Sequence, residues 1–335
     1  MGGFHRLPLD TLKLLFSKID VNVTVRRIEA VYVNSGRGRP RYPVRSMLLA
    51  LLFMRFEATP SIRKLCRRLE RRQYAREICE FNGRSTPNHT TFSKFITKAE
   101  PKNIENQFKE LRDQAFRMGI IDPEEAVKVS VDSTFMKAYS RRGRKGGISD
   151  RGARIGKTER RSYELGWSPH SHINVSPSTY LHCQVCKRQR QRSCQATFEA
   201  GFTPDQTLRK AHSQGHSRQA ILLCRRLENH KAIGAEPIIP HPTNVKDQLI
   251  NLWVTKRFRA KGDPTLVNLY KLRMTVERGF KSGKLELMME NLRWRGIAKV
   301  RMHVAICFTC MYAVAITAHK IGRPELANSV AAFTY

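Results

Sequence analysis

The stretch Ala126-Val127-Lys128-Val129-Ser130-Val131-Asp132-Ser133 decides the fold of the second half of this chain. Its valines alternate with polar residues, and a period of two residues is typical of a strand with one buried face. Asp132 falls on the polar face, near the end of the run. The sequence therefore predicts a half-buried β-strand over residues 126–133 that presents a carboxylate at its polar end.

A second informative segment lies near the C-terminus, where Tyr270, Arg273, Glu277 and Lys284 follow the spacing Tyr-x2-Arg-x3-Glu-x6-Lys. At about 100° per residue, the last three lie within roughly 60° of Tyr270 around a helix. One helix face would then carry a carboxylate flanked by two cations and a phenol. A carboxylate can hold Mg²⁺ and cations can hold phosphates beside it, although a charged face in solvent has the same pattern.

This spacing resembles the Tyr-Arg-Glu-Lys signature of insertion-sequence DDE transposases, and the resemblance extends over most of the chain. It implies an α/β catalytic core with a ribonuclease-H-like mixed sheet flanked by helices. An all-α, helix-turn-helix-like domain would precede this core. The expected boundaries are residues 1–120 for the helical DNA-binding domain and 121–335 for the catalytic domain. Tyr163-Glu164-Leu165-Gly166-Trp167 and His170 resemble the second-strand motif of the family.

The resemblance also implies a chemistry and the residues that carry it. Asp132 is expected to be the first catalytic metal ligand and Glu277 the last. Each site would hold two Mg²⁺ ions, with Mn²⁺ as an acceptable substitute, for strand cleavage at the element's ends and transfer to target DNA. The resemblance places Tyr270, Arg273 and Lys284 against the DNA backbone, and Arg278 against DNA or a neighbouring helix. Transposases of this type generally pair two ends within a homodimer.

The composition supports a nucleic-acid partner. Among 335 residues, 61 are Lys or Arg and 28 are Asp or Glu, a formal net charge of +33. A bias of this size indicates a polyanionic partner such as DNA or RNA, and a membrane surface is the weaker alternative. The longest apolar stretch, residues 304–318, is short for a membrane span of about 20 residues and predicts a buried helix. With no secretory pattern near Met1 and no disulfide framework, we expect a cytoplasmic, nucleoid-associated prokaryotic protein.

The first 120 residues predict helices with basic faces. Residues 46–53 are apolar enough for a buried helix, and Ser61 is expected to cap a basic helix over residues 62–72. Thr86 or Asn88 could cap a following helix packed by Phe92, Phe95 and Ile96. A basic helix followed by a turn and a second helix indicates a helix-turn-helix. The alternative is a plain helical domain with a solvated basic face. The residues expected to contact DNA here are Asn88, Thr90 and Lys94, together with Arg37 and Arg39 in a loop that resembles an AT-hook or is only a basic turn.

Further elements are expected in the second half. A glycine-rich basic loop spans residues 141–156. Residues 163–167 and 173–175 are candidates for two strands, and residues 236–240 for a short buried one. Residues 293–319 predict one or two closing helices, in which His303 is interpreted as a core histidine and Cys307 and Cys310 as small core residues.

Residues 178–231 do not fit this plan, because hydrophobic periodicity disappears and the family's second catalytic aspartate has no in-frame match. If Arg218-Gln219-Ala220-Ile221-Leu222-Leu223 is back-translated with suitable codons and read one nucleotide later, it spells Asp-Arg-Gln-Tyr-Ser-Ser, which resembles the missing segment. We therefore hypothesise a compensated frameshift over residues 178–231, with poor folding of that region. Asp205 is the in-frame candidate for the second catalytic aspartate, but it lies in a Phe-Thr-Pro-Asp-Gln turn and is the less favoured explanation.

Three alternatives remain open. The first is a structural zinc site formed by His182, Cys183, Cys186 and Cys194, since one Cys-x2-Cys pair is a modest zinc signal. The second concerns activity. Loss of one of three metal carboxylates predicts an impaired transposase, and the alternative is a catalytically dead remnant that still binds DNA. An unrelated nuclease or integrase with the same core is the third reading.

Overall fold

The computed structural model describes residues 11–32, 40–81, 83, 85–121, 129–140, 147–157, 163–174, 180–186 and 274–334. Its contacts divide the chain into two compact units. One unit joins Met1–Arg188 to Thr275–Tyr335, and the other is Gln189–Met274. Strands and helices from both ends of the sequence therefore belong to one body.

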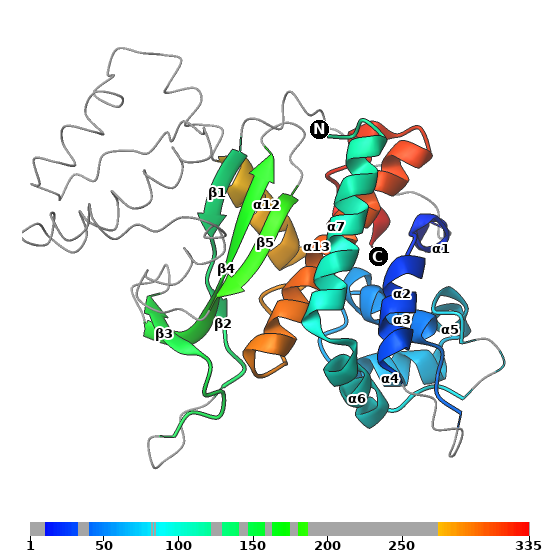
Figure 1. The fold of residues 1–335 in the computed structure, drawn as a ribbon, viewed down its shortest axis with the longest axis horizontal. Helices are drawn as coiled ribbons and strands as arrows, with labels where there is room; N and C mark the ends of the chain where they lie inside the picture. The colour runs from blue at the N-terminus through cyan, green and yellow to red at the C-terminus, as the bar shows by residue number, and fades with distance from the viewer. Residues whose placement is uncertain are drawn as a thin grey trace, which may run out of the picture. The chain divides into compact units, whose positions relative to one another are not determined.

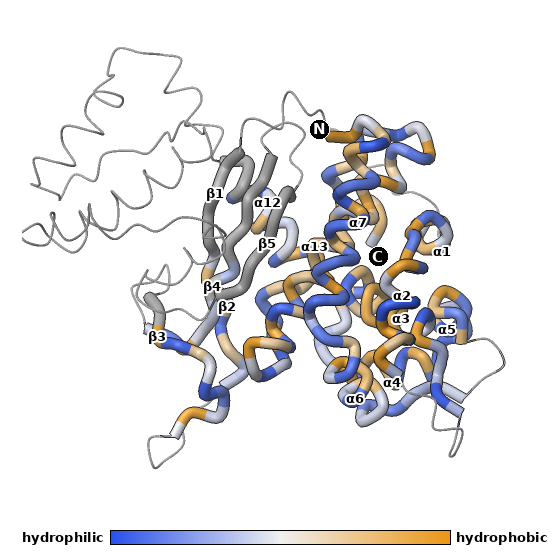
Figure 2. Tube along the Cα trace, viewed as in Figure 1, coloured by the Kyte–Doolittle hydropathy of each residue, from blue (hydrophilic) through white to orange (hydrophobic). Residues whose placement is uncertain are grey.

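Seven helices occupy the described part of the first 120 residues, which confirms the helical N-terminal region (Figure 1). The third is the most apolar, as Figure 2 shows, and all of its residues except Arg45 are buried. It contains the run that predicted a buried helix. The helices are α1 (Thr11–Lys18), α2 (Asn22–Val31), α3 (Val44–Phe56), α4 (Ile62–Arg71), α5 (Gln73–Ile78), α6 (His89–Ala99) and α7 (Pro101–Arg117).

The N-terminal ends of α4 and α6 are capped as the sequence predicts. The Ser61 hydroxyl accepts the backbone N–H of Lys64 at 3.3 Å, and Asn88 Oδ1 accepts that of Thr91 at 2.9 Å. Such caps satisfy backbone donors that have no partner within the helix. The short helix α5 and the segment 79–88 separate α4 from α6. Helices α4, α5 and α6 therefore form a three-helix arrangement, which differs from the predicted helix-turn-helix of two consecutive helices.

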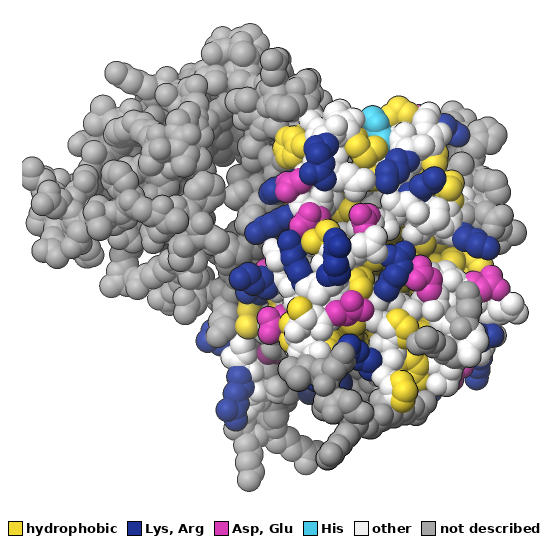
Figure 3. All heavy atoms as spheres, turned by 45° about the vertical axis from the view of Figure 1, so that its right-hand side comes forward, with side chains coloured by type: hydrophobic (Ala, Val, Ile, Leu, Met, Phe, Trp, Pro, Cys, Tyr) yellow, Lys and Arg dark blue, Asp and Glu magenta, His cyan; other side chains and the backbone are white. Residues whose placement is uncertain are grey.

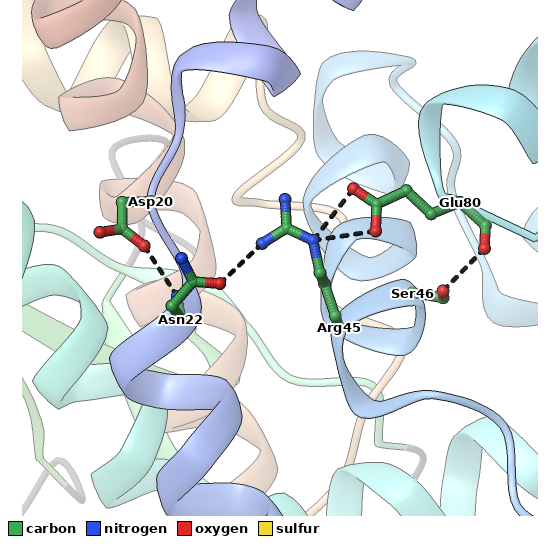
Figure 4. A network of polar contacts seen from close by, with 5 residues as sticks. All are labelled: Asp20, Asn22, Arg45, Ser46 and Glu80. Atoms are coloured by element: carbon green, nitrogen blue, oxygen red, sulfur yellow. Dashed lines mark hydrogen bonds and ion pairs between the residues drawn. The ribbon is translucent and has the colours of Figure 1, made fainter.

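A polar network fixes the corners of these helices (Figure 4). Arg45 of α3 donates through Nε to both carboxylate oxygens of Glu80 at 3.0 and 2.8 Å, and through Nη1 to Asn22 of α2 at 3.1 Å. The Asn22 N–H in turn donates to Asp20 at 2.9 Å, and the Ser46 hydroxyl to the Glu80 carbonyl at 3.0 Å. These bonds join the start of α2 and the start of α3 to the turn after α5.

The described strands form a five-stranded sheet around one long strand, β4. All the pairings are antiparallel. The first half of β4 pairs with β2 and β3, and its second half pairs with β1 and β5. The prediction of two strands over residues 163–175 is therefore wrong, because one extended segment serves two sets of partners. The strands are β1 (Val129–Ser133), β2 (Met136–Lys137), β3 (Arg154–Lys157), β4 (Tyr163–Asn174) and β5 (Tyr180–Cys186).

The C-terminal part consists of α12 (Met274–Leu285), α13 (Ile297–Lys320) and the short 3-10 helices η2 (Pro324–Leu326) and η3 (Val330–Phe333). Helix α13 contacts α1, α3 and α7 on one side and β5 on the other, so it lies between the N-terminal helices and the sheet (Figure 1). It is the one described helix long and apolar enough to cross a membrane, and 94% of its most apolar window is buried. This confirms the predicted buried helix.

The interior of α13 explains its histidine and cysteines. Cys307, Cys310 and His303 are buried, and the ring nitrogen Nε2 of His303 lies 2.9 Å from the Met289 carbonyl. Burial, together with the nearby Arg55, lowers the pKa of His303 to about 3. The ring is therefore neutral and donates its Nε2 proton. This confirms that His303 is a satisfied core histidine and the two cysteines are core residues.

Candidate active site and DNA-binding surface

The candidate catalytic aspartate, Asp132, lies in β1, next to the last residue of that strand. The backbone register pairs it with Ser171 of β4, and Ser171 in turn pairs with Cys183 of β5. Among the described strands, β1 pairs only with β4. A mixed sheet would need a parallel strand at the other side of β1, and residues 236–240, predicted as a strand, lie outside the described residues.

The candidate catalytic glutamate, Glu277, lies in the first turn of α12 and is exposed. Arg278 and Lys281 are exposed on the same helix, while Phe280 and Gly283 are buried. The helix therefore turns one side inward and presents a carboxylate among cations on the other. Asp132 and Glu277 are 145 positions apart in the sequence, yet both belong to the same compact unit.

Close packing holds α12 in place. A Cβ added at Gly283 would lie 2.8 Å from Cε of Met289 and 2.9 Å from Cε of Met311, so the absent side chain allows α12 to approach α13. At the end of α12, Lys284 forms an ion pair with Glu290 at 2.7 Å, and its side chain is 20% exposed. A DNA phosphate that binds Lys284 would therefore have to displace the Glu290 carboxylate or bind the ammonium group together with it.

Two further acids lie near the candidate site in sequence, and each already has a role. Asp150 is buried, and its carboxylate accepts the backbone N–H groups of Gly152 and Gly296 at 3.3 and 3.2 Å. Glu164 pairs with Lys137 at 2.6 Å. Within the part of the chain that the structure describes, no group of three or more His, Cys, Asp or Glu side chains could hold a metal ion. The described residues thus offer oxygen ligands suited to a hard cation, but only two of the three expected carboxylates.

The exposed face of α6 suits contact with a polyanion. Lys94 and Lys98 are exposed on it, together with small polar residues, and α6 carries no acidic residue. The hydroxyls on this face are engaged within the helix: Ser93 donates to His89 at 2.9 Å and Thr97 to Ser93 at 3.0 Å. The cations are therefore the main groups left to meet phosphates.

Asn88 and Thr90, both expected to contact DNA, are exposed at the start of α6 and also take part in its cap. Asn88 Oδ1 accepts the Thr90 hydroxyl at 2.7 Å, the Thr91 N–H at 2.9 Å and the Thr91 hydroxyl at 2.9 Å. Three donors saturate this oxygen, so Asn88 can offer only its amide N–H groups to a ligand. The reason is local, because the start of α6 needs a cap.

Helix α4 presents most, but not all, of its cations outward. Arg63, Lys64 and Arg67 are exposed, whereas Arg68 turns inward and pairs with the buried Glu57 carboxylate at 2.5 Å. Figure 3 shows Lys and Arg side chains spread over one face of the molecule with acidic side chains interspersed, rather than gathered in one patch. Charge alone therefore does not mark the DNA-binding surface on this face.

Several predicted residues lie outside the described residues: Tyr270, Arg273, Arg37, Arg39, Cys194 and Asp205. The hypothetical frameshift segment, residues 178–231, does too, apart from β5. That strand pairs with β4 from Tyr180 to Cys186, with a register shift between His172 and Ile173 of β4. His182, Cys183 and Cys186 are in β5, and the zinc hypothesis stays untested.

The sequence reasoning missed Lys281, which lies four residues after Glu277 and is exposed with it on α12. The spacing of one helical turn was the signal that could have found it. It also missed Tyr139, Arg293 and Arg295, whose contact joins segments 156 residues apart. The one local signal for this contact was the pair of arginines on either side of Trp294.

The body combines strands and helices, with an aspartate on β1, a glutamate on α12 and a basic helical region, as the sequence predicts for an enzyme that processes nucleic acid. Comparison with protein families specifies it further. Residues 123–313 match the family described as "Transposase DDE domain", and residues 5–98 match "Transposase domain (DUF772)". The chain belongs to the DDE transposase family. The DDE domain implies a ribonuclease-H-like fold and a divalent-metal-dependent enzyme that acts on DNA. Neither the curated proteins nor the solved structures give a match.

Proposed function

We propose that this transposase binds the terminal inverted repeats of an insertion sequence and catalyses metal-dependent strand cleavage and strand transfer. One observation supports this most directly. The DDE match spans residues 123–313 and so includes both Asp132 on β1 and Glu277 on α12, which belong to one compact unit. Residues 1–120 form the DNA-binding domain in this proposal and residues 121–335 the catalytic domain.

In this proposal Asp132 and Glu277 are the carboxylates that hold Mg²⁺, or Mn²⁺ in its place. When bound, paired divalent ions lower the pKa of an attacking water and stabilise the leaving oxygen of a phosphodiester. The chain's own cations orient the substrate: Arg278, Lys281 and Lys284 lie within two turns of Glu277 on α12 and would neutralise phosphates on either side of the cut. Tyr270 and Arg273 precede the same helix and are proposed to contact the same DNA backbone.

The DNA-binding domain is proposed to dock through α4 and α6. Lys94 lies in the middle of the exposed, acid-free face of α6, and Arg63, Lys64 and Arg67 add charge from α4. The amide N–H groups of Asn88, the Thr90 side chain and the arginines Arg37 and Arg39 are the further proposed contacts. Cations of this kind supply affinity and register through phosphates, while polar edges supply sequence preference.

We further propose that catalysis by this chain is impaired, because the second aspartate is absent from residues 178–231. The hypothesis of a compensated frameshift predicts that the gene's codons, read one nucleotide later, encode the aspartate motif. If those codons cannot encode it, the hypothesis is wrong. The alternative function is a DNA-binding remnant without catalysis, which would bind the same ends through residues 1–120. A homodimer that pairs two ends in the prokaryotic cytoplasm completes the proposal.

Cleavage of a labelled duplex carrying the element's end, in Mg²⁺, tests the catalytic part. We expect weak or no cleavage by the chain as it stands, and a gain of activity when residues 178–231 are replaced by the sequence of the alternative frame. In that restored chain, Asp132→Asn and Glu277→Gln should each lower the rate by orders of magnitude. Glu29→Gln, which changes an exposed glutamate on α2, is the matched control. Normal turnover by the unrestored chain would contradict the proposed impairment.

A further inference from the structure

Tyr139, in the segment that follows β2, lies against two arginines of the connection between α12 and α13. The guanidinium carbon of Arg293 lies 5.3 Å from the centroid of the Tyr139 ring, and that of Arg295 lies 5.1 Å from it. Both distances fall within the cation–π range of about 6 Å. The Tyr139 residue is 43% exposed, and both arginines are exposed. Three side chains from two distant segments therefore meet at one place on the surface.

Hydrogen bonds join the backbone segments around this place. Arg295 Nε donates to the Tyr139 carbonyl at 3.0 Å. The buried Asp150 carboxylate accepts the N–H of Gly296 at 3.2 Å, and the Asp150 N–H donates to the Ser140 hydroxyl at 3.0 Å. Figure 1 shows the beginning of α13 beside the segment that follows β2. The Arg295 guanidinium group is therefore tied to the backbone beside the Tyr139 ring, while Arg293 Nε donates to Oδ1 of Asn291 at 3.1 Å.

Among the residues that the structure describes, no acid forms an ion pair with the cations at this place. Neither Arg293 nor Arg295 forms an ion pair with a carboxylate in the described portion of the chain, and the adjacent acid, Asp150, is buried and bonded to backbone N–H groups. Arg151 and Arg154, which follow Asp150, are exposed as well. Guanidinium groups that share one ring repel each other, and an anion between them would relieve that repulsion. Two such groups provide planar donors for the oxygens of a phosphate.

We propose that Tyr139, Arg293 and Arg295 form a clamp for a phosphodiester of the DNA duplex that enters the active site. The inference rests on the proposed function, because it takes Asp132 as a catalytic residue. Tyr139 is seven residues beyond Asp132 in the sequence, so their Cα atoms lie at most about 25 Å apart. With about 3.4 Å of duplex per nucleotide of one strand, the clamp holds a phosphate within roughly seven base pairs of the cut.

The chemistry of the clamp predicts that it reads charge and not sequence. Because two guanidinium groups lie over the Tyr139 ring, the ring is not an open platform for a base. The Nε groups of Arg293 and Arg295 already donate to Asn291 and to the Tyr139 carbonyl. The remaining donors are the Nη groups and the phenol hydroxyl, which suit phosphate oxygens. Contacts to phosphates position a duplex but carry no base information. The clamp therefore holds DNA near the cut whatever its sequence, including the DNA that flanks the element.

Salt-dependent binding of the full chain to a 40-base-pair duplex of scrambled sequence tests the clamp. Each phosphate contact contributes about 0.9 to the slope of log affinity against log salt. We expect Arg293→Gln/Arg295→Gln to lower this slope by about 0.9, the value for one phosphate. Tyr139→Phe should weaken binding about 2–12-fold, the scale of one hydrogen bond. Lys102→Ala/Lys109→Ala, which removes two exposed charges from α7, is the control and should change the slope less.

A second experiment, on a duplex that carries the element's end, locates the phosphate that the clamp contacts. Single neutral methylphosphonate linkages within seven base pairs of the cut should weaken binding to the wild-type chain at one or two positions, and this effect should vanish in the Gln variant. An unchanged slope in that variant, or an equal loss in the α7 control, would overturn the clamp. Failure of the wild-type chain to prefer the element's ends would count against the proposed function alone, because the salt slope, on which the clamp is judged, is measured on scrambled DNA.

Discussion

The rings of Phe108 on α7 and Tyr312 on α13 meet edge to face, with centroids 5.3 Å apart and an interplanar angle of 70°. Phe308 lies on the same side of α13, 6.2 Å from Phe108. An ion pair between Arg301 and Glu105, with Nη2 and Oε2 2.5 Å apart, adds a polar contact between the two helices. The last helix of the DDE match thus completes the core of the N-terminal helices.

Phe108→Ala is therefore expected to destabilise the whole chain and not the N-terminal region alone. Removal of a buried phenylalanine costs about 3–5 kcal/mol of unfolding free energy, because it removes buried apolar surface and leaves a cavity. Phe116→Ala, on the same helix but only partly buried, should cost less. Thermal unfolding followed by circular dichroism measures both. Two separate transitions in the variant, with one unchanged, would contradict a shared core.

Gly166 in β4 tests the sheet. A Cβ at this position would lie 2.2 Å from two atoms of the Phe135 ring and 2.5 Å from the Met136 carbonyl oxygen. Since the backbone oxygen cannot move without breaking the pairing of β2 with β4, we expect Gly166→Ala to cost more than about 3 kcal/mol. Gly147→Ala meets nothing within 4 Å and is the matched control. Equal unfolding midpoints for the two variants would show that this part of the sheet is placed differently.

Local patterns predicted the parts of the fold that local chemistry determines. Ser61 and Asn88 cap their helices as expected, and the apolar run in α3 is buried. The single strand β4 was not predicted, because Pro169 and two histidines interrupt the apolar pattern of a segment that changes partners midway. A strand with different neighbours at its two ends has no single period of two residues.

The candidate site was predictable only where one motif contained it. Glu277 and Lys284 share a helix, so their spacing was informative. Arg67 and Arg68 are adjacent basic residues in the sequence, and nothing local predicts that they differ. In the structure only Arg68 turns inward, because it pairs with the buried Glu57 carboxylate. Likewise, nothing near Tyr139 in the sequence indicates Arg295, because the contact depends on how α13 begins beside the sheet. Residues that meet through tertiary packing leave no local pattern.

His303 predicts how stability depends on pH. Its pKa is about 3 in the folded chain, compared with about 6.5 when unfolded. Between these values only the unfolded state binds the proton, so the free energy of unfolding falls as pH drops from about 6.5 toward 3, by up to about 1.4 kcal/mol per pH unit. Above pH 6.5 this effect is absent. The charged and polar groups at the ring are Arg55 and the Met289 carbonyl.

Denaturant unfolding of the wild type and His303→Gln between pH 4 and 8 measures this linkage. The glutamine amide can still donate to Met289, but it does not titrate. We expect the stability difference between the two chains to be constant above pH 7 and to shift in favour of the variant in acid. A difference independent of pH would mean that His303 has the same pKa in the folded and unfolded chains, and would contradict its burial as a neutral ring.

Asn88 and Lys94 separate the cap of α6 from its DNA contact. Because Asn88 Oδ1 accepts three donors, Asn88→Ala should cost about 1 kcal/mol of stability, and Asn88→Ser, which can also cap, should restore most of it. Lys94→Ala should leave stability unchanged and reduce the salt slope of DNA binding by about one. If the Asn88 side chain reads a base instead, the serine variant will bind element ends as poorly as the alanine variant while keeping full stability. Recovery of both stability and affinity in Asn88→Ser would identify the cap as its main role.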